Sequence, residues 1–505
     1  MTLVSCFNNT FSKNTSRVAV DFYGKRIPFS ELDKNSNKVA NALIRLGIKK
    51  GDKVAQFLDN SPELIYFFIG ALKAGCVVVP INTYYKEAEV GHMLSNSGSK
   101  LILVNTERMK VLENCKGNLE ELRHIITVEN NEKYTSFDNF VKNSMENEPN
   151  IKLSNDDGAI IFYTSGTTGK SKGALLTHYN VESNLKALKE AWHWTDNDKL
   201  LLCLPLYHIH GLGVALCGSF YNGSFIVLRK KFLPDDVLPL IQQHECTLFM
   251  GVPTMYIKIL EAKDREKYDI SSMRLFISGS APLSSETFKE FKDVFGHEIL
   301  ERAGMSETMM NFSNPYKGKK KPGTVGKPLP GVEVRIVDAD FNDVEKGEAG
   351  EIMIKGPNIL KEYWNFPRLN GEAFRQGWFR TGDIGRMDED GYIIFVGRAR
   401  DMIITGGLKV YPREVEETID QHPAVKESAV VGVPDKLFGE SVRAYVVLKE
   451  NANAREEEII SFCRQKLAGF KKPKNVEFLK ELPRTSTGKV QKNILRERAM
   501  KSKAS

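Results

Sequence analysis

Residues 163–173 read YTSGTTGKSKG and follow directly on the apolar run AIIF at residues 159–162. These eleven residues hold three glycines, five serine or threonine hydroxyls and two lysines. Glycine exposes backbone N–H groups, and together with hydroxyl and ammonium donors these can wrap a chain of phosphates. We therefore predict a phosphate-binding loop directly after a strand, with a flexible surface turn as the alternative.

The letters GKS within this loop invite comparison with the P-loop of nucleotide hydrolases. That loop has the pattern G-x-x-x-x-G-K-[ST] and opens a helix. Here the residue five before Gly169 is Thr164, and the following GALLTH at residues 173–178 is typical of a strand. The stretch is therefore not expected to be a P-loop of that kind.

Around this loop, short apolar runs rich in β-branched residues alternate with helical patterns. The helical pattern SPELIYFFIGALKAG at 61–75 has a good start at Pro62, after Ser61, and a good stop at Gly75. The order of strands and helices predicts an α/β fold with parallel sheets. The strand candidates are KVAQFLDN at 53–60, VVVPIN at 77–82, KLILVN at 100–105 and HIITVE at 124–129.

The residue pattern changes twice along the chain, and each change predicts a further subdomain or domain. Gly323 to Val396 is punctuated by glycine and is typical of short strands, which predicts an antiparallel or β-barrel-like subdomain within the large domain. After GRARD at 397–401 the pattern is that of a compact α+β module of about a hundred residues. We therefore expect a large N-terminal domain over residues 1–399 and a small, mobile C-terminal domain over residues 400–505.

Composition excludes several protein classes. Of 505 residues, 41% are hydrophobic and 27% charged, which excludes disordered and fibrous proteins. Seven widely spaced cysteines without a CxxC pair indicate neither a zinc site nor a disulfide framework, so we expect a cytoplasmic location. Residues 200–228 lack Lys, Arg, Asp and Glu, but Pro205 and four glycines interrupt them, so we expect buried core and no transmembrane segment.

The net charge of +7 is concentrated near the C-terminus. Residues 464–503 hold 13 lysines and arginines against three glutamates. Such a patch suits an anionic partner. Because neither interleaved aromatic side chains nor a nucleic-acid motif accompanies the cations, a phosphorylated cofactor or a solvated surface is favoured over nucleic acid.

Seven motifs occur in order along nearly the whole chain. They are YTSGTTGKSKG at 163–173, LPLYHIHG at 204–211, ISGSAPL at 277–283, GMSET at 304–308, WFRTGDIG at 378–385, GRARDMIITGGLKVYPREVE at 397–416 and LPRTSTGKVQK at 482–492. In these motifs the chain resembles the adenylate-forming acyl-CoA synthetases, relatives of luciferases and of peptide-synthetase adenylation domains.

The resemblance implies an ATP-dependent acid–thiol ligase. In that family a carboxylate attacks the α-phosphate of ATP to give an acyl-adenylate and pyrophosphate, and the thiol of coenzyme A then displaces AMP. The expected cofactors are therefore ATP, Mg²⁺ and coenzyme A, and the expected partner is a small carboxylic acid.

The resemblance also implies which residues bind the nucleotide and the metal. Glu307 would be the magnesium ligand, together with Thr164, because hard oxygens suit a cation that keeps most of its waters. Asp383 would accept hydrogen bonds from both ribose hydroxyls, and Arg398 would face the ribose or a phosphate, with a structural salt bridge as the alternative. The full set expected to bind ATP or AMP is Thr164, Ser165, Gly166, Thr167, Thr168, Gly169, Lys170, Ser280, Ala281, Ala303, Gly304, Met305, Ser306, Asp383 and Arg398.

The implied catalytic residues are Lys489, His208 and Glu307. Lys489 matches the catalytic lysine, whose ammonium can bridge two anions that repel each other. His208 is expected beside the acyl carboxylate, although a histidine in an apolar run is commonly a hydrogen-bonded core residue. Arg400 lies where the family has its hinge, and Gly406 and Gly407 would let the backbone approach the pantetheine chain of coenzyme A.

Three stretches further resemble malonyl-CoA synthetases, which accept short dicarboxylates. A second carboxylate needs a cation inside the acyl pocket. We expect Arg302 to supply it, unless Arg302 pairs with Glu301 or Glu307, and Lys258 and Ser278 are further acyl-binding candidates. The stretches are MRLFISGSAPL at 273–283, LERAGMSETMMNFSNP at 300–315 and KVQKNILRE at 489–497.

Ala303 departs from the family pattern, which has an aromatic ring at this position to stack on adenine, so we predict weaker ATP binding. Three alternatives stay open: a ligase for medium- or long-chain fatty acids, an adenylation enzyme that loads a carrier-protein thiol, and a non-catalytic nucleotide-binding protein. The sequence does not choose between a monomer and a homodimer.

Overall fold

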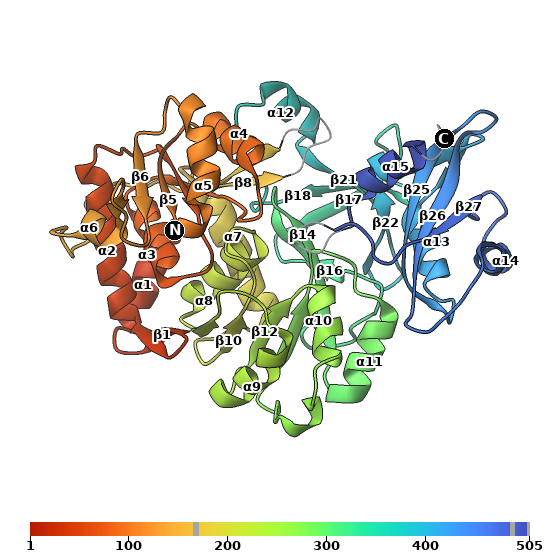
Figure 1. The fold of residues 1–505 in the computed structure, drawn as a ribbon, viewed down its shortest axis with the longest axis horizontal. Coiled ribbons are helices and arrows are strands. Elements are labelled where there is room, and N and C mark those ends of the chain that lie inside the picture. The colour runs from red at the N-terminus through yellow and green to blue at the C-terminus, as the bar shows by residue number, and fades with distance from the viewer. Residues whose placement is uncertain (165–170, 485–489, 502–505) are drawn as a thin grey trace. The chain divides into compact units, whose positions relative to one another are not determined.

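The computed structural model describes residues 1–164, 171–484 and 490–501. The chain forms two compact units, one from Met1–Glu333 with Lys355–Gly377 and the other from Val334–Ile354 with Trp378–Ser505. Figure 1 labels their helices and strands. The functional domain boundary expected at residue 400 stays a prediction.

The first unit is built on two mixed sheets. In one, five neighbouring strands in the order β8-β4-β3-β5-β6 are parallel, and β9 and β19 add to one edge in antiparallel fashion. The predicted parallel sheet is thereby confirmed. The strands are β3 (Lys53–Phe57), β4 (Val77–Pro80), β5 (Ser99–Val104), β6 (His124–Thr127), β7 (Thr135–Ser136), β8 (Gly158–Thr164), β9 (Lys172–Thr177) and β19 (Glu362–Tyr363).

The second sheet of this unit runs β16-β15-β14-β13-β12-β10-β11-β1-β2. The strands from β14 to β1 are parallel, while β15, β16 and β2 are antiparallel to their neighbours. The strands are β1 (Val18–Phe22), β2 (Lys25–Pro28), β10 (Lys199–Leu202), β11 (Phe225–Leu228), β12 (Leu248–Gly251), β13 (Leu275–Ser278), β14 (Ile299–Met305), β15 (Met309–Ser313) and β16 (Lys327–Pro328).

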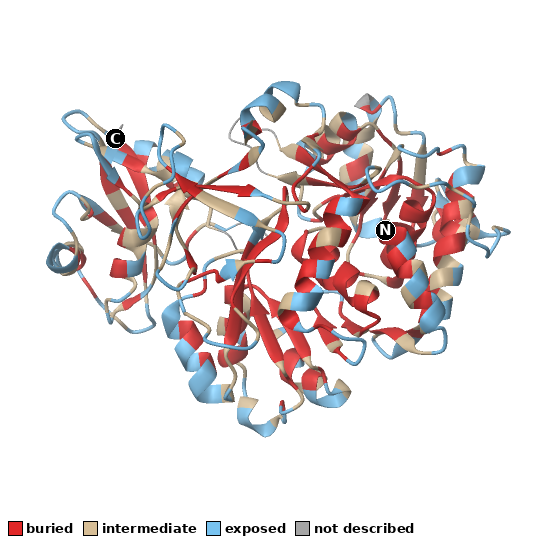
Figure 2. Ribbon diagram, turned by 180° about the vertical axis from the view of Figure 1, so that it is seen from behind, coloured by how far each residue is buried: buried red, intermediate tan, exposed pale blue. Residues whose placement is uncertain are grey.

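Many helices of the first unit bury one side and expose the other, as the red and pale blue faces in Figure 2 show, whereas α3 and η2 have no exposed residue. The predicted signals at 61–75 are confirmed, because α3 begins at Pro62, Ser61 Oγ accepts from Leu64 N at 3.2 Å and Gly75 has a φ of +75°. The helices are α1 (Leu3–Lys13), α2 (Phe29–Arg45), α3 (Pro62–Lys73), α4 (Glu87–Ser97), α5 (Thr106–Cys115), η1 (Lys116–Asn118), α6 (Phe137–Val141), α7 (His178–Trp192), η2 (His210–Leu216), α8 (Cys217–Asn222), α9 (Pro234–His244), α10 (Pro253–Leu260), η3 (Arg265–Lys267), α11 (Ser285–Phe295) and α12 (Pro367–Ala373).

The uncharged segment 200–228 forms buried core, as predicted. It is divided among β10, the π-helical segment η2, α8 and β11, and nearly all of its residues are buried. Glycine explains part of this packing, since a Cβ at Gly211 would stand 2.2 Å from the carbonyl oxygen of Pro205. Among the described helices, none has a stretch long and apolar enough to cross a bilayer.

The second unit has two further sheets, one around β18, β21 and β22 and one in the order β24-β23-β26-β25 with β27 beside β26. Helices α13 and α14 cover one face of the latter sheet, and Leu495 and Ala499 of α15 pack on the other. The expected antiparallel region and α+β module are thus both present. The elements are β17 (Glu333–Val337), β18 (Gly350–Lys355), β21 (Trp378–Met387), β22 (Ile393–Arg398), η4 (Ala399–Asp401), β23 (Ile403–Thr405), β24 (Leu408–Val410), α13 (Pro412–Ile419), β25 (Val425–Asp435), β26 (Gly439–Leu448), α14 (Glu456–Lys466), β27 (Asn475–Phe478) and α15 (Lys492–Lys501). The short strand β20 (Phe374–Arg375) falls within the residues of the first unit.

Candidate active site

Strands β8 and β9 flank the glycine-rich loop, and their antiparallel register ends with Thr164 opposite Lys172. A strand, and not a helix, follows the loop, since β9 spans Lys172–Thr177. This confirms that the stretch lacks the helix that a Walker-type P-loop requires. The loop residues expected to bind phosphate, Ser165, Gly166, Thr167, Thr168, Gly169 and Lys170, lie outside the described residues.

Thr164 and Glu307 meet at the end of β8, and their role as metal ligands stays a prediction. The Thr164 hydroxyl donates to Glu307 Oε1 at 3.3 Å, and the Tyr363 hydroxyl donates to the same oxygen at 3.1 Å. Glu307 is buried. Within the described residues, no cluster of three or more His, Cys, Asp or Glu side chains could hold a metal. One carboxylate beside a hydroxyl fits Mg²⁺, which takes few protein ligands and otherwise binds waters and substrate phosphates.

The turn between β14 and β15 brings Gly304 into close backbone contact. A Cβ at this position would stand 1.8 Å from the carbonyl oxygen of Met309, so only glycine fits. The register of β14 and β15 shifts between Ala303 and Gly304, which marks a bulge. Ala303 is buried, Met305 and Ser306 are half-buried, and Ser280 and Ala281 are half-buried after β13.

Arg302, on β14, is buried and forms no ion pair with any residue that the structure describes. It is 2% exposed, and its Nε and Nη2 atoms have no hydrogen-bond partner among the described residues. The pairing with Glu301 or Glu307 considered above is not recorded: Glu301 Oε1 accepts from Leu283 N at 3.1 Å, and Glu307 from the two hydroxyls named above. Burial lowers the pKa of Arg302 to about 9, so the guanidinium remains charged at pH 7.

Arg302 lies against the segment after β13. A Cβ on Gly279 would stand 2.5 Å from the guanidinium carbon of Arg302. Ser278 is fully buried, and its hydroxyl has no partner within the described part of the chain. Lys258, by contrast, is exposed on α10, so its acyl-binding role remains a prediction that rests on sequence alone.

The two histidines of LYHIHG have different surroundings. His208 is half-buried, and its Nδ1 accepts a hydrogen bond from the backbone N–H of His210 at 3.3 Å. His210 is 1% exposed, with Nδ1 3.4 Å from Ser280 Oγ and Nε2 without a partner among the described residues. Sequence analysis selected His208 and not His210, whose only signal in the sequence is that it is a second histidine in the same motif.

In the second unit, Asp383 and Arg398 form an ion pair. Arg398 Nε lies 2.6 Å from Asp383 Oδ1, and the two residues are directly opposite in the register of β21 and β22. The salt bridge that was the alternative reading of Arg398 is therefore present. It also orients the Asp383 carboxylate, and the ribose contacts expected of both residues stay predictions.

The expected hinge and coenzyme A residues lie near the start of the following sheet. Arg400 is exposed in η4, and its neighbour Asp401 pairs with Arg496 at 2.7 Å. Gly406 and Gly407 connect β23 to β24 with φ angles of +56° and +78°. A two-residue hairpin turn of type I′ needs positive φ at both positions, so turn geometry by itself explains these glycines.

Lys489 lies outside the described residues, but both sides of its segment are anchored. Arg484 and Val490 form an isolated antiparallel bridge. Arg484 also pairs with Glu427, and Lys492 lies 2.6 Å from Glu416. Arg484 and Lys492, which flank the segment, are thus held to β25 and α13.

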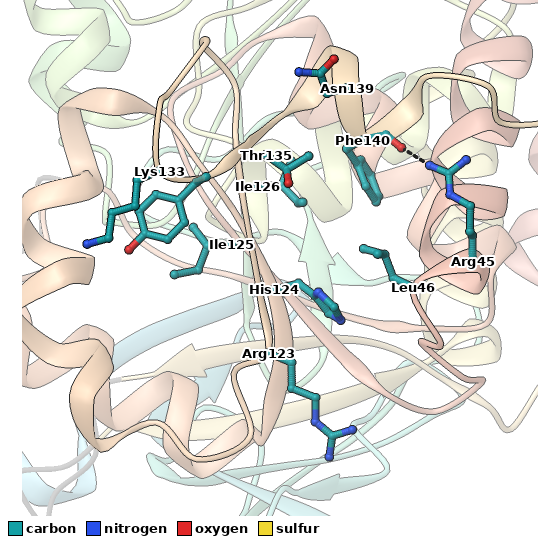
Figure 3. Close-up of a pocket in the computed structure, with 11 residues that line it drawn as sticks. Arg45, Leu46, Arg123, His124, Ile125, Ile126, Lys133, Thr135, Asn139 and Phe140 are labelled. Carbon is teal, nitrogen blue, oxygen red and sulfur yellow. Dashed lines mark hydrogen bonds between the residues drawn. The ribbon is translucent and has the colours of Figure 1, made fainter.

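A separate cavity of about 290 Å³ lies beside β6, β7 and α6 (Figure 3). Its cations already have partners: Arg45 Nη2 donates to the carbonyl of Phe140 at 2.7 Å, and Lys133 Nζ lies 3.0 Å from Glu113. None of the described residues predicted to bind ATP or the acid lines it. This cavity is therefore not the candidate active site.

The chain is similar to known proteins over nearly its whole length. Residues 7–364 match the AMP-binding enzyme family, and residues 414–489 match the AMP-binding enzyme C-terminal domain. A long-chain-fatty-acid–CoA ligase of Bacillus subtilis (strain 168) is 35% identical, with 98% of this chain and 94% of that protein covered. A malonate–CoA ligase of Arabidopsis thaliana is 34% identical, with 98% and 88% covered.

Among solved structures, ATP-bound MatB from Rhodopseudomonas palustris superposes with a TM-score of 0.92. It is 38% identical to this chain, and 99% of each chain is covered. The fold of this chain is therefore shared with that ATP-bound protein.

Proposed function

This chain belongs to the AMP-binding enzyme family and is an AMP-forming acyl-CoA ligase, and on that premise we propose that its acid is malonate or a closely related short dicarboxylate. ATP, Mg²⁺ and coenzyme A are its cofactors and substrates. The carboxylate attacks the α-phosphate of ATP to give the acyl-adenylate with release of pyrophosphate, and the thiol of coenzyme A then displaces AMP.

The proposal rests on the burial of Arg302, whose Nε and Nη2 atoms have no hydrogen-bond partner among the described residues. A buried guanidinium without a partner is costly, on the order of several kcal/mol, unless a ligand supplies the missing charge and hydrogen-bond acceptors. A carboxylate does both, because its two oxygens match the planar donors of arginine. A fatty acid has only methylene and methyl groups to offer at this position, and these would leave the donors unsatisfied.

The residue roles that follow belong to the same proposal. Thr164 and Glu307 hold Mg²⁺, which when bound neutralises phosphate charge; Asp383 and Arg398 bind the ribose; and His208 lies beside the reacting carboxylate. Lys489 supplies the cation that two approaching anions require, and its loss is expected to slow adenylation roughly a thousandfold. The proposal also includes Arg400 as the hinge at a domain boundary near residue 400. The backbone at Gly406 and Gly407 approaches coenzyme A, and the enzyme is located in the cytoplasm.

A panel of acids tests the substrate. Purified enzyme with ATP, Mg²⁺ and coenzyme A is assayed for pyrophosphate release with malonate, methylmalonate, acetate, propionate, octanoate and palmitate. We expect kcat/KM to be highest for malonate or methylmalonate. Activity on the monocarboxylic acids alone would reject the dicarboxylate while leaving the ligase intact, and a preference for palmitate would identify a fatty-acid ligase.

Arg302→Met tests whether the charge of Arg302 binds the distal carboxylate, because methionine approximates the length of the arginine side chain without its charge. Removing one partner of a buried charge pair costs about 2–5 kcal/mol, so kcat/KM for malonate should fall at least about thirtyfold relative to that for propionate. Arg229→Met is the matched control, since Arg229 is also buried but already pairs with Asp21 at 3.3 Å. The control should leave the ratio of the two substrates unchanged.

A further inference from the structure

Three buried polar side chains converge on the backbone around Gly279. Arg302 packs against Gly279 itself, Ser278 precedes it, and His210 lies 3.4 Å from the hydroxyl of Ser280. Each of the three has at least one side-chain nitrogen or oxygen that is buried and without a hydrogen-bond partner among the described residues. Buried polar groups are normally hydrogen-bonded, so several unpaired polar groups close together indicate that a polar ligand supplies their partners.

His210 is neutral at this place. Burial, reinforced by the positive charge of Arg302, holds the pKa of His210 well below its ordinary value. A neutral imidazole carries one N–H donor and one acceptor nitrogen. When the Ser280 hydroxyl donates to Nδ1, the proton of His210 lies on Nε2, the nitrogen that has no partner in the described structure.

We infer that His210 is a specificity-determining residue, which donates a hydrogen bond from Nε2–H to the distal carboxylate of the acid while Arg302 neutralises its charge. The inference rests on the proposed dicarboxylate substrate. One carboxylate with four acceptor sites can satisfy Arg302, His210 and Ser278 together, so that one charge of each sign is buried and the donors are paired.

In this arrangement the two histidines have different roles, with His210 at the distal carboxylate and His208 at the reacting one. The backbone N–H of His210 donates to Nδ1 of His208, so the ring of His208 is oriented by the same residue that we assign to the distal carboxylate. His208 thus remains for the reacting carboxylate. An acid without a distal carboxylate leaves His210, Ser278 and Arg302 unsatisfied, and these residues select against it.

The test compares two replacements of His210. His210→Leu removes the donor and keeps an apolar side chain of moderate size, whereas His210→Gln offers an amide N–H that can stand in for Nε2–H. For His210→Leu we expect the malonate-to-propionate ratio of kcat/KM to fall about ten- to a hundredfold, because a hydrogen bond to a charged group is lost. His210→Gln should recover most of that ratio.

His178→Leu is the matched control. His178 is also fully buried, and neither of its ring nitrogens has a partner among the described residues, but it lies at the start of α7. Its loss should leave the substrate ratio unchanged. An unchanged ratio in His210→Leu, together with a collapsed ratio in Arg302→Met, overturns the role of His210 and leaves the dicarboxylate proposal standing. A wild-type preference for monocarboxylic acids overturns both.

A measurement on the wild-type enzyme covers the case in which His210→Leu fails to fold. With ¹⁵N-labelled histidine, His210 should be the Nε2–H tautomer in the malonate complex, and the resonance of its Nε2–H proton should move downfield with malonate but not with propionate, which offers that proton no acceptor. A malonate complex in which His210 carries its proton on Nδ1 overturns the inference.

Discussion

The guanidinium of Arg302 lies so close to Gly279 that a methyl group on residue 279 would stand 2.5 Å from its central carbon. The absence of a side chain at residue 279 therefore sets the position of the only charge that we assign to the distal carboxylate. Glycine here is needed for a close approach and not for an unusual backbone angle, since Gly279 is not among the residues with positive φ.

Gly279→Ala should consequently displace Arg302 and raise the KM for malonate about tenfold or more, with a smaller effect on propionate. Steady-state assays with both acids measure this. Gly371→Ala is the control, because a Cβ on Gly371 in α12 would meet nothing within 4 Å. An equal loss for both acids would contradict the proposed role of Arg302.

Glu307→Gln should raise the Mg²⁺ concentration needed for half-maximal ATP–pyrophosphate exchange and lower kcat about a hundredfold. The amide keeps the shape of the side chain and can still accept from Thr164 and Tyr363, but it loses the charge that suits a hard cation. Glu182→Gln is a matched control, since Glu182 is also buried and accepts from a tyrosine hydroxyl, that of Tyr221 at 3.3 Å. An unaltered Mg²⁺ requirement in Glu307→Gln would remove Glu307 from the metal site.

Ala303→Tyr should lower the KM for ATP several-fold, because an aromatic face can stack on adenine where a methyl group cannot. Because residue 303 is buried, the melting temperatures of variant and wild type are compared first, to check that the folded protein accepts the larger side chain. A folded variant whose KM for ATP equals that of the wild type would show that the ring is not needed there.

Asp420→Asn tests the electrostatics of the second unit. Burial, with the charges of Glu416 and Glu427 adding to it, raises the pKa of Asp420 from 3.8 to about 7. The folded chain therefore holds a proton that the unfolded chain releases above about pH 4, so this carboxyl makes the wild type less stable as pH rises from about 4 to about 7.

We expect Asp420→Asn to be stabilised relative to the wild type by about 1–4 kcal/mol at pH 8 and by much less at pH 4.5. Denaturant unfolding of both proteins at the two pH values measures the difference. A stability difference that does not change with pH would mean that Asp420 titrates normally.

Sequence reasoning succeeded where the signal was local. Ser61, Pro62 and Gly75 predicted the ends of α3, because capping and left-handed turns depend on residues within one helical turn. Likewise the strand character of residues 173–178 already separated the glycine-rich loop from a Walker P-loop. The order of the motifs indicated the family over the whole chain.

What the sequence by itself determined is therefore the class of elements, the family and the residue types available for catalysis. Only the tertiary structure decided that Arg302 has no counter-charge among the described residues, that His210 lies against Ser280, and that Asp383 and Arg398 stand opposite each other on two strands. The physical reason is that burial and pairing depend on groups far apart in the chain, here residues 210, 278–280 and 302, which only the packing of β13 and β14 beside the start of η2 brings together.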